Sequence, residues 1–234
     1  MTSHPLTAHP HSRLRYGAEL LVLAATGALL AFYYVGRADV IGVSSATRGW
    51  AAMTLRALPD GAHFAVAAVL LAVVPVVAAR RLTGLSLEQL GLGFGNVRAG
   101  FILLVAAAPL AVLAGALGAA SPTMRAVYPL FPVAAHHGFV AYALLQFLYF
   151  GAWEVLFRGV LLFGLRRDLG EGSANALQTA LSVTAHFGRA INETASALPA
   201  GLVFGWVDLK LGSIWYVAIL HWLVGVSMDW FILH

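Results

Sequence analysis

The chain has 234 residues, of which 60% are hydrophobic and only 10% are charged, and its formal net charge is +4. A charged fraction this far below the roughly 25% of soluble domains argues against a soluble enzyme, and a mean hydropathy of +0.83 favours a membrane protein. The absence of cysteine excludes disulfides, thiolate metal sites and cysteine nucleophiles. The basic residues lie at the ends of apolar runs without interleaved aromatic residues, which argues against a nucleic-acid partner.

The first half of the chain is predicted to cross the membrane three times. Residues 1–16 form a polar tail, and the apolar run 17–35 is too long for the core of a signal peptide, so we expect a retained first span. A connecting loop at 36–62, with a short interfacial helix, precedes the second span at 63–79. The third span is the uncharged run 99–120.

The second half of the chain contains four further apolar runs. As a helix, residues 138–165 would extend about 42 Å, which exceeds the roughly 30 Å hydrocarbon core, so this run must tilt, bend or project. The runs 174–187 and 194–207 are short for independent spans, and residues 213–234 form the last span. The predicted fold is therefore an all-α polytopic transmembrane bundle of about seven spans.

The domain division and the orientation follow from these spans. We assign residues 17–137 to N-terminal transmembrane helices and loops, and residues 138–234 to a C-terminal core, which the resemblance given below implies to be catalytic. If the spans alternate, eight Lys and Arg residues fall on one side of the membrane and five on the other. The positive-inside rule then predicts a multi-pass protein of the cell membrane with its N-terminus in the cytoplasm. The larger set comprises Arg13, Arg15, Arg80, Arg81, Arg98, Arg166, Arg167 and Lys210.

Ionisable residues inside the apolar runs mark a candidate site. Glu154 and Arg158 stand four residues apart, so on a helix they share a face and can pair. Counted from the cytoplasmic ends of three different spans, Glu154, His186 and His221 each lie about 16 to 18 Å deep. Side chains of this kind at bilayer depth usually face the interior of a bundle and mark a functional site. We therefore expect the three residues to converge.

A carboxylate and two imidazoles allow two kinds of chemistry. Glu154, kept ionised by Arg158, can take a proton from water, one histidine can share that water, and the other can stabilise an oxyanion. The same residues, Glu154, His186 and His221, also match a possible zinc site with two histidines, one glutamate and an open position. The residue types alone leave the glutamic and the zinc-dependent hydrolase open.

Three segments in order resemble the motifs of a known superfamily. They read WEVLFRGVLLFGL, TALSVTAHFG and SIWYVAILHWLVGVSMDW, and they are similar to the three motifs of the CPBP superfamily of intramembrane endopeptidases, which includes CAAX proteases and bacteriocin-processing proteins. The resemblance implies hydrolysis of a peptide bond in a membrane-embedded peptide or protein. It also implies that Glu154 activates water, that Arg158 orders Glu154, that His186 assists and that His221 contributes to the oxyanion site, with no cofactor required.

The chain departs from the motifs of the superfamily at three positions. Trp153 stands where the first glutamate is expected, Ser182 replaces a phenylalanine, and Gly225 replaces the oxyanion asparagine. These departures leave two alternatives to a protease open: a catalytically silent member that binds a membrane partner, and a small proton-coupled transporter that uses the buried residues as a relay.

Four further charged residues receive peripheral assignments. Glu193 is expected in a connecting loop that faces the lipid headgroups, and Asp229 is expected near Glu193 at the outer rim of the bundle. Asp208 and Lys210 are interpreted as interface residues that flank a span.

Overall fold

The computed structural model describes residues 11–36, 61–131, 135 and 138–234, and within these ranges the protein is helical, without a strand. The all-α prediction is therefore confirmed for the described part of the chain. Nearly all of the predicted loop 36–62, with its interfacial helix, lies outside the described residues.

The N-terminal half contains three long helical rods. The first rod begins at His11, so the last residues of the predicted polar tail are helical, while its apolar span begins at Gly17 as expected. The second rod is helical without interruption, and the third begins at the cap residue Asn96, whose side chain accepts a hydrogen bond from the backbone of Ala99. The elements are α1 (His11–Ala31) with a π-helical turn (Phe32–Gly36), α4 (Gly61–Ala67), a π-helical segment (Ala68–Val73), α5 (Val74–Thr83), α6 (Val97–Ala119) and the short α7 (Pro122–Arg125).

The C-terminal half contains one very long rod and three further helices. The long rod runs from Phe139 to Leu169 without a break, so the prediction of one continuous run is confirmed. Gly170 and Gly212 adopt positive φ angles of 78° and 67° and separate the rods that follow. The elements are α9 (Phe139–Glu154), a π-helical segment (Val155–Phe163), α10 (Gly164–Leu169), α11 (Glu171–Ala185), α12 (Ile191–Leu211) and α13 (Trp215–Leu233).

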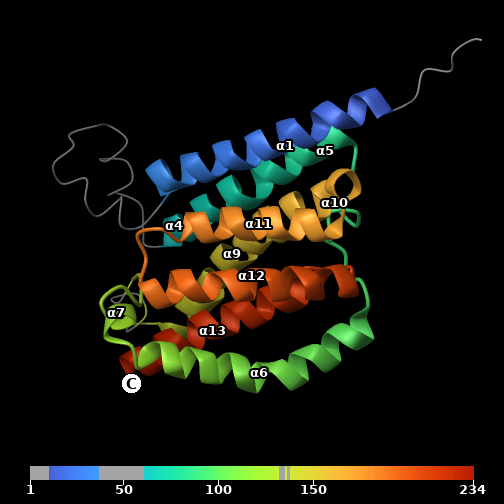
Figure 1. Ribbon diagram of the computed structural model, residues 1–234. Helices are drawn as coiled ribbons and strands as arrows, with labels where there is room; N and C mark the ends of the chain where they lie inside the picture. Colours follow the sequence, from blue (N-terminus) through green and yellow to red (C-terminus); the bar gives the residue numbers. More distant parts are fainter. Residues whose placement is uncertain (1–10, 37–60, 132–134, 136–137) are drawn as a thin grey trace, which may run out of the picture.

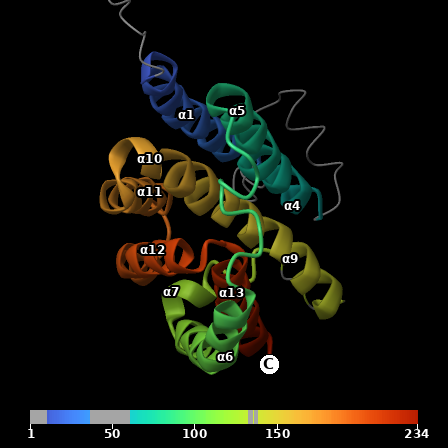
Figure 2. The ribbon, with the colours of Figure 1, turned by 90° about the vertical axis from the view of Figure 1, so that its right-hand side faces the viewer.

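The helices run roughly parallel and stack in tiers (Figure 1). Viewed from the end, α1, α4 and α5 form one outer tier, the rod of α9 and α10 lies with α11 in the middle, and α12, α13 and α6 form the other outer tier (Figure 2). The central rod contacts α4 on one side and α13 on the other, while α6 packs on α13. Every residue of the π-helical segment Val155–Phe163 is buried, so the core of the bundle surrounds the segment that carries the first motif.

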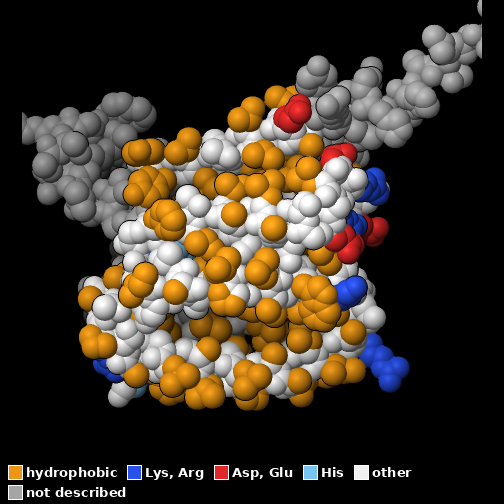
Figure 3. Space-filling model, in the orientation of Figure 1, with side chains coloured by type: hydrophobic (Ala, Val, Ile, Leu, Met, Phe, Trp, Pro, Cys, Tyr) orange, Lys and Arg blue, Asp and Glu red, His pale blue; other side chains and the backbone are white. Residues whose placement is uncertain are grey.

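The outer surface suits a lipid environment. Among the described residues, five helices are long and apolar enough to cross a membrane: Gly17–Tyr34, His63–Thr83, Val97–Ala119, Phe139–Leu169 and Trp215–Leu233. Hydrophobic side chains cover the flank of the molecule, and charged side chains gather mainly at one end (Figure 3). The last turns of α5, α10 and α12 carry basic residues, as the predicted distribution of charge requires. The count of seven spans and the cytoplasmic N-terminus stay predictions.

The loop between α5 and α6 fixes the start of α13. The carbonyl of Gly91 accepts a hydrogen bond from the backbone nitrogen of Ile214 at 3.0 Å, and the carbonyl of Leu92 accepts one from the indole of Trp215 at 2.9 Å. Gly95 has a φ of +53°, and a Cβ there would collide with the carbonyl oxygen of Leu211, so the loop approaches the end of α12 at a distance that only glycine permits. These contacts set the depth of α13 in the bundle.

Candidate active site

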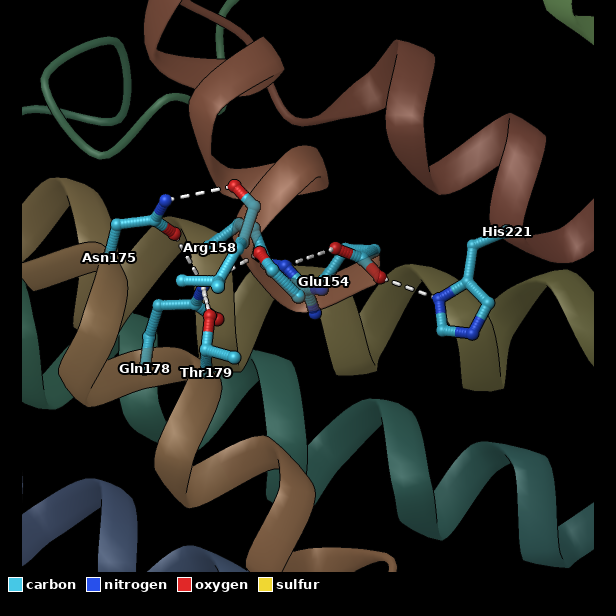
Figure 4. A network of polar contacts seen from close by, with 8 residues as sticks. Glu154, Arg158, Asn175, Gln178, Thr179 and His221 are labelled. Atoms are coloured by element: carbon cyan, nitrogen blue, oxygen red, sulfur yellow. Dashed lines mark hydrogen bonds and ion pairs between the residues drawn. The ribbon is translucent and has the colours of Figure 1, made fainter. Parts of the chain in front are cut away.

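Glu154 and Arg158 form a buried ion pair in the central rod. Glu154 is the last residue of α9, and Arg158 lies one turn later in the π-helical segment Val155–Phe163. Their side chains are 0% and 3% exposed, and Oε2 of Glu154 lies 3.2 Å from Nε of Arg158. Figure 4 shows the two side chains pointing toward one another. Because both groups are withdrawn from water, removal of either would leave an uncompensated buried charge.

His221 joins this pair from α13. Its Nδ1 lies 2.6 Å from Oε1 of Glu154 (Figure 4). A carboxylate oxygen accepts hydrogen bonds, so Nδ1 of His221 donates and the ring presents Nε2 to another partner. The His221 side chain is 26% exposed, whereas the Glu154 side chain is fully buried. The buried Glu154 carboxylate therefore orients the His221 ring through Nδ1.

His186 follows directly after α11 and is fixed by backbone contacts. Its Nδ1 lies 2.7 Å from the carbonyl oxygen of Ser182. A carbonyl oxygen can only accept, so Nδ1 carries the hydrogen and Nε2 is the acceptor nitrogen of the neutral ring. The carbonyl of His186 in turn accepts a hydrogen bond from the hydroxyl of Thr194 at 3.0 Å. This contact ties the start of α12 to the histidine.

A buried amide cluster joins α11 to α12. Nε2 of Gln178 lies 2.7 to 3.1 Å from three acceptors, namely Oδ1 of Asn175, the hydroxyl of Thr179 and the carbonyl of Gly201. Asn175 donates to the carbonyl of Leu202 at 2.9 Å. Figure 4 shows this cluster beside the buried ion pair. Hydrogen bonds of this kind between apolar helices fix their relative position, and hence the turn that carries the second motif.

Both histidines line one cavity of about 270 Å³. It lies between the helices, and among the described residues its lining comes from α1 and the π-helical turn after it, α4, the segment after α7, α9, α11, the turn after α11, α12 and α13. The polar lining includes Tyr128, Gln146, His186, Arg189, Glu193 and His221. The apolar lining includes Leu29, Leu30, Phe32, Phe64, Leu130 and Phe150. The cavity is therefore polar at the histidines and apolar toward α1.

The comparison with protein families agrees with this geometry. Residues 135–227 match the family described as Type II CAAX prenyl endopeptidase Rce1-like, which is part of the CPBP superfamily. Over these residues the chain is similar to the CPBP superfamily. No curated protein and no solved structure matches the chain. Together with the five long apolar helices among the described residues, this similarity indicates an integral membrane protein.

The three departures from the CPBP motifs have structural consequences. Trp153 lines the cavity, and its ring meets the ring of His186 edge-on at a centroid distance of 5.1 Å. Gly225 lies under Phe150, so a Cβ at this position would collide with the phenyl ring. Ser182 is buried and supplies the carbonyl that holds His186. Aromatic rings, those of Trp153 and Phe150, therefore lie where two of the motifs carry a polar side chain.

The structure brings the four predicted site residues into one region but gives them unequal access to the cavity. His186 and His221 line it, whereas Glu154 and Arg158 do not. Among the described residues, no group of three His, Asp or Glu side chains is arranged to hold a metal ion. Glu154 already directs one oxygen at His221 and the other at Arg158, so the expected zinc ligands do not fit a zinc ion in this arrangement.

Two carboxylates that the sequence assigned to the periphery are placed differently. Glu193 does not lie in a headgroup-facing loop, since it belongs to the first turn of α12 and lines the cavity. Asp229 is fully buried and not at the rim, and it accepts hydrogen bonds from Tyr142 and Gln146 on α9. A glutamate seven residues after a motif histidine, at the predicted start of a helix, was the sequence signal for the first of these positions.

Asp208 also differs from its assignment to the interface. It is fully buried in α12, and its carboxylate oxygens have no hydrogen-bond partner in the described part of the chain. It does not line the cavity. Lys210, two residues later, is exposed as expected.

Proposed function

We propose that the protein is an intramembrane endopeptidase that hydrolyses a peptide bond of a membrane-presented protein or peptide inside the cavity. The observation that carries the proposal is a pair of imidazole rings that line one cavity. Both histidines belong to the segment that matches the family, and hydrogen bonds hold each ring in place. Each ring uses Nδ1 for a contact that orients it, so each has Nε2 left for chemistry.

The two histidines suit different steps of hydrolysis. Nε2 of His186 is an acceptor in the neutral ring, so this residue accepts a proton from water as the water attacks the carbonyl carbon. His221, backed by the Glu154 carboxylate, is suited to hold positive charge, so it stabilises the oxyanion of the tetrahedral intermediate. In this scheme Glu154 and Arg158 are positioning residues that act through His221.

We further propose that the reaction requires no metal, because both oxygens of Glu154 are directed at His221 and Arg158. Incubation with a strong zinc chelator followed by gel filtration should leave cleavage unchanged within about twofold, measured on the same peptide before and after treatment. Loss of cleavage that added zinc restores would contradict this part of the proposal.

The lining of the cavity indicates the class of substrate. Its apolar part faces α1 and its polar part contains the histidines, which suits an amphiphilic peptide whose apolar side chain or lipid group remains in a hydrophobic environment. The matching family is described as a CAAX prenyl endopeptidase, so a farnesylated C-terminal peptide is a suitable first probe.

The test uses the purified full chain in liposomes with a farnesylated peptide and a panel of single-span peptides. His186→Ala and His221→Ala should each lower cleavage by at least about 100-fold, as expected for loss of a general base or an oxyanion donor. His234→Ala is the matched control, because this exposed histidine stacks on Trp230 away from the cavity. Cleavage that persists in His186→Ala would overturn the proposal.

A second candidate function is supported by Trp153 and Gly225. An aromatic ring beside His186 and the phenyl ring over Gly225 narrow the site, as in a CPBP protein that binds a membrane peptide without cleaving it. Such a protein would bind the same peptides in a His186-independent way, and mass spectrometry would find them intact.

A further inference from the structure

The cavity contains a carboxylate that the CPBP motifs do not account for. Among the described residues that line it, Glu193 is the acidic one, and Glu154 is not part of the lining. The motif glutamate that would precede Glu154 is replaced by Trp153. A water molecule in the cavity would thus meet the carboxylate of α12 and not that of α9.

Two hydrogen bonds fix the position of Glu193: one to its own side chain and one made by the neighbouring residue Thr194. The hydroxyl of Tyr128 donates to Oε1 of Glu193 at 2.9 Å. Burial, reinforced by the nearby Glu193 carboxylate, raises the pKa of Tyr128 well above its usual value, so the phenol keeps its hydrogen and remains a donor. Next along the chain, Thr194 anchors the same turn to the carbonyl of His186 at 3.0 Å. The carboxylate and the histidine therefore belong to one fixed turn.

The segment after α6 supports this arrangement from outside. Asn192 donates to the hydroxyl of Ser121 at 3.2 Å, and the Arg125 side chain donates to the carbonyl of Ala119 at 2.6 Å. These contacts place the segment that carries Tyr128 against the first turn of α12. Tyr128, the donor to Glu193, therefore belongs to a segment that is itself held by hydrogen bonds.

The second oxygen of Glu193 is unused. Oε2 is buried and has no hydrogen-bond partner within the described ranges. A buried carboxylate oxygen without a partner is costly, and beside a cavity with two histidines its natural partner is a water molecule or a substrate group. Oε2 of Glu154 also has no hydrogen bond, but it lies 3.2 Å from Nε of Arg158 in an ion pair, and Glu154 does not line the cavity.

We propose that Glu193 is the catalytic carboxylate of this protein, acting with His186 on the attacking water. In this refinement of the mechanism Glu193, in place of His186, accepts a proton from the water as the water oxygen bonds to the carbonyl carbon, while Nε2 of His186 accepts a hydrogen bond from the other hydrogen of that water. Glu193 returns this proton to the amide nitrogen as the C–N bond breaks, so one water is consumed, an acid and an amine are formed, and the carboxylate is regenerated. This assignment rests on the proposed protease function, and it moves the proton acceptor from His186 to Glu193.

A labelling experiment tests the assignment without any substrate. Dicyclohexylcarbodiimide, an apolar reagent that couples to reachable carboxyl groups, is added to the full chain in detergent at mildly acidic pH, and mass spectrometry locates the adduct. The Glu193 peptide should carry at least about fivefold more label than the Glu154 peptide, because only Glu193 lines the cavity. Equal or stronger label on Glu154, or no label on Glu193, overturns the assignment.

A kinetic experiment tests the chemistry with the farnesylated peptide as probe. Glu193→Gln should lower kcat by at least about 100-fold with KM changed less than threefold, and Glu193→Asp should recover part of the loss. Glu171→Gln is the matched control, because Glu171 is an exposed residue in the first turn of α11 and does not line the cavity. A Glu193→Gln protein that keeps more than half of the wild-type kcat overturns the assignment and leaves the protease proposal standing. A wild-type protein without His186-dependent cleavage overturns the protease proposal instead.

Discussion

Glu154 and Glu193 are two carboxylates inside the same bundle, but their surroundings are opposite in kind. Glu154 lies in the middle of an unbroken rod, fully buried, with a cation at one oxygen and an imidazole at the other. Glu193 lies at the beginning of a helix, with one oxygen bonded to a phenol and one without a hydrogen-bond partner in the described part of the chain.

The difference teaches that depth in a membrane protein and access to substrate are separate properties. A fully buried carboxylate that is ion-paired and does not line the cavity, as in Glu154, can orient a neighbour but has little freedom to exchange protons with water. A partly satisfied carboxylate at a cavity wall has that freedom. The predictions below test whether the two residues differ in this way.

The largest effect is expected at Arg158. Arg158→Leu leaves the Glu154 charge buried without its cation, which should lower the free energy of unfolding by about 3 to 5 kcal/mol. Chemical denaturation in detergent, followed by intrinsic fluorescence, measures this change. Arg81→Leu is the control, because Arg81 is exposed in the last turn of α5. A loss below about 1 kcal/mol at Arg158 would show that the pair is not the buried ion pair described above.

Substitution of the two glutamates should separate stability from activity. Glu154→Gln leaves Arg158 without its counter-charge, so unfolding should become easier by about 3 kcal/mol. Glu193→Gln removes no ion partner of comparable burial, so its effect should stay below about 1 kcal/mol. Both proteins are compared in one denaturation series, and equal losses would erase the contrast between the two sites.

Gly225→Ala tests the packing of Phe150 on Gly225, the position at which the motif carries asparagine. The added Cβ collides with the Phe150 ring, which itself packs on His221 at a centroid distance of 4.8 Å. Overpacking should cost about 2 to 3 kcal/mol and displace the histidine, with a fall in kcat. Gly27→Ala is the matched control, because a Cβ there has open space in α1 and should stabilise the helix by about 0.5 to 1 kcal/mol. Unchanged stability in Gly225→Ala would mean that Phe150 moves freely.

Tyr128→Phe should have the smallest effect. It removes one hydrogen bond to a carboxylate, worth about 1.5 kcal/mol, and leaves Glu193 in the cavity without its donor. We expect kcat to fall by about tenfold while the protein stays folded, as steady-state kinetics and thermal unfolding would show. A change in KM alone would indicate that Tyr128 binds substrate and does not position Glu193.

Much of the fold could be predicted because long apolar runs in a sequence predict membrane-spanning helices. The long run before Leu169 and the span that contains His221 follow from hydrophobicity alone. The start of α1 at His11 was not predicted. Arg13 and Arg15 were assigned to a polar tail because they are charged, although arginine also favours helix. Whether α11 and α12 span the membrane is difficult to predict from hydrophobicity, because both contain polar residues. In the structure, Asn175 and Gln178 of α11 donate hydrogen bonds to backbone carbonyls of α12.

The candidate site was predictable as a set of residues but not as a geometry. Glu154, Arg158, His186 and His221 were found from charge in apolar runs and from motif spacing. Their unequal access to the cavity depends on rotation about each helix axis, which sequence spacing alone does not define. Glu193 was missed for the same reason, since a glutamate at a helix start faces headgroups or a cavity according to how that helix packs.

The wall contributed by α1 has a consequence for the design of hybrids. The family match begins at residue 135, yet Leu29 and Leu30 of α1 form part of the cavity. The half of the chain outside the match thus shapes the space beside the histidines. A chimaera that takes only α1 (His11–Ala31) from a CPBP protein should retain Tyr128 and the other catalytic residues and acquire the donor's tolerance for side-chain size.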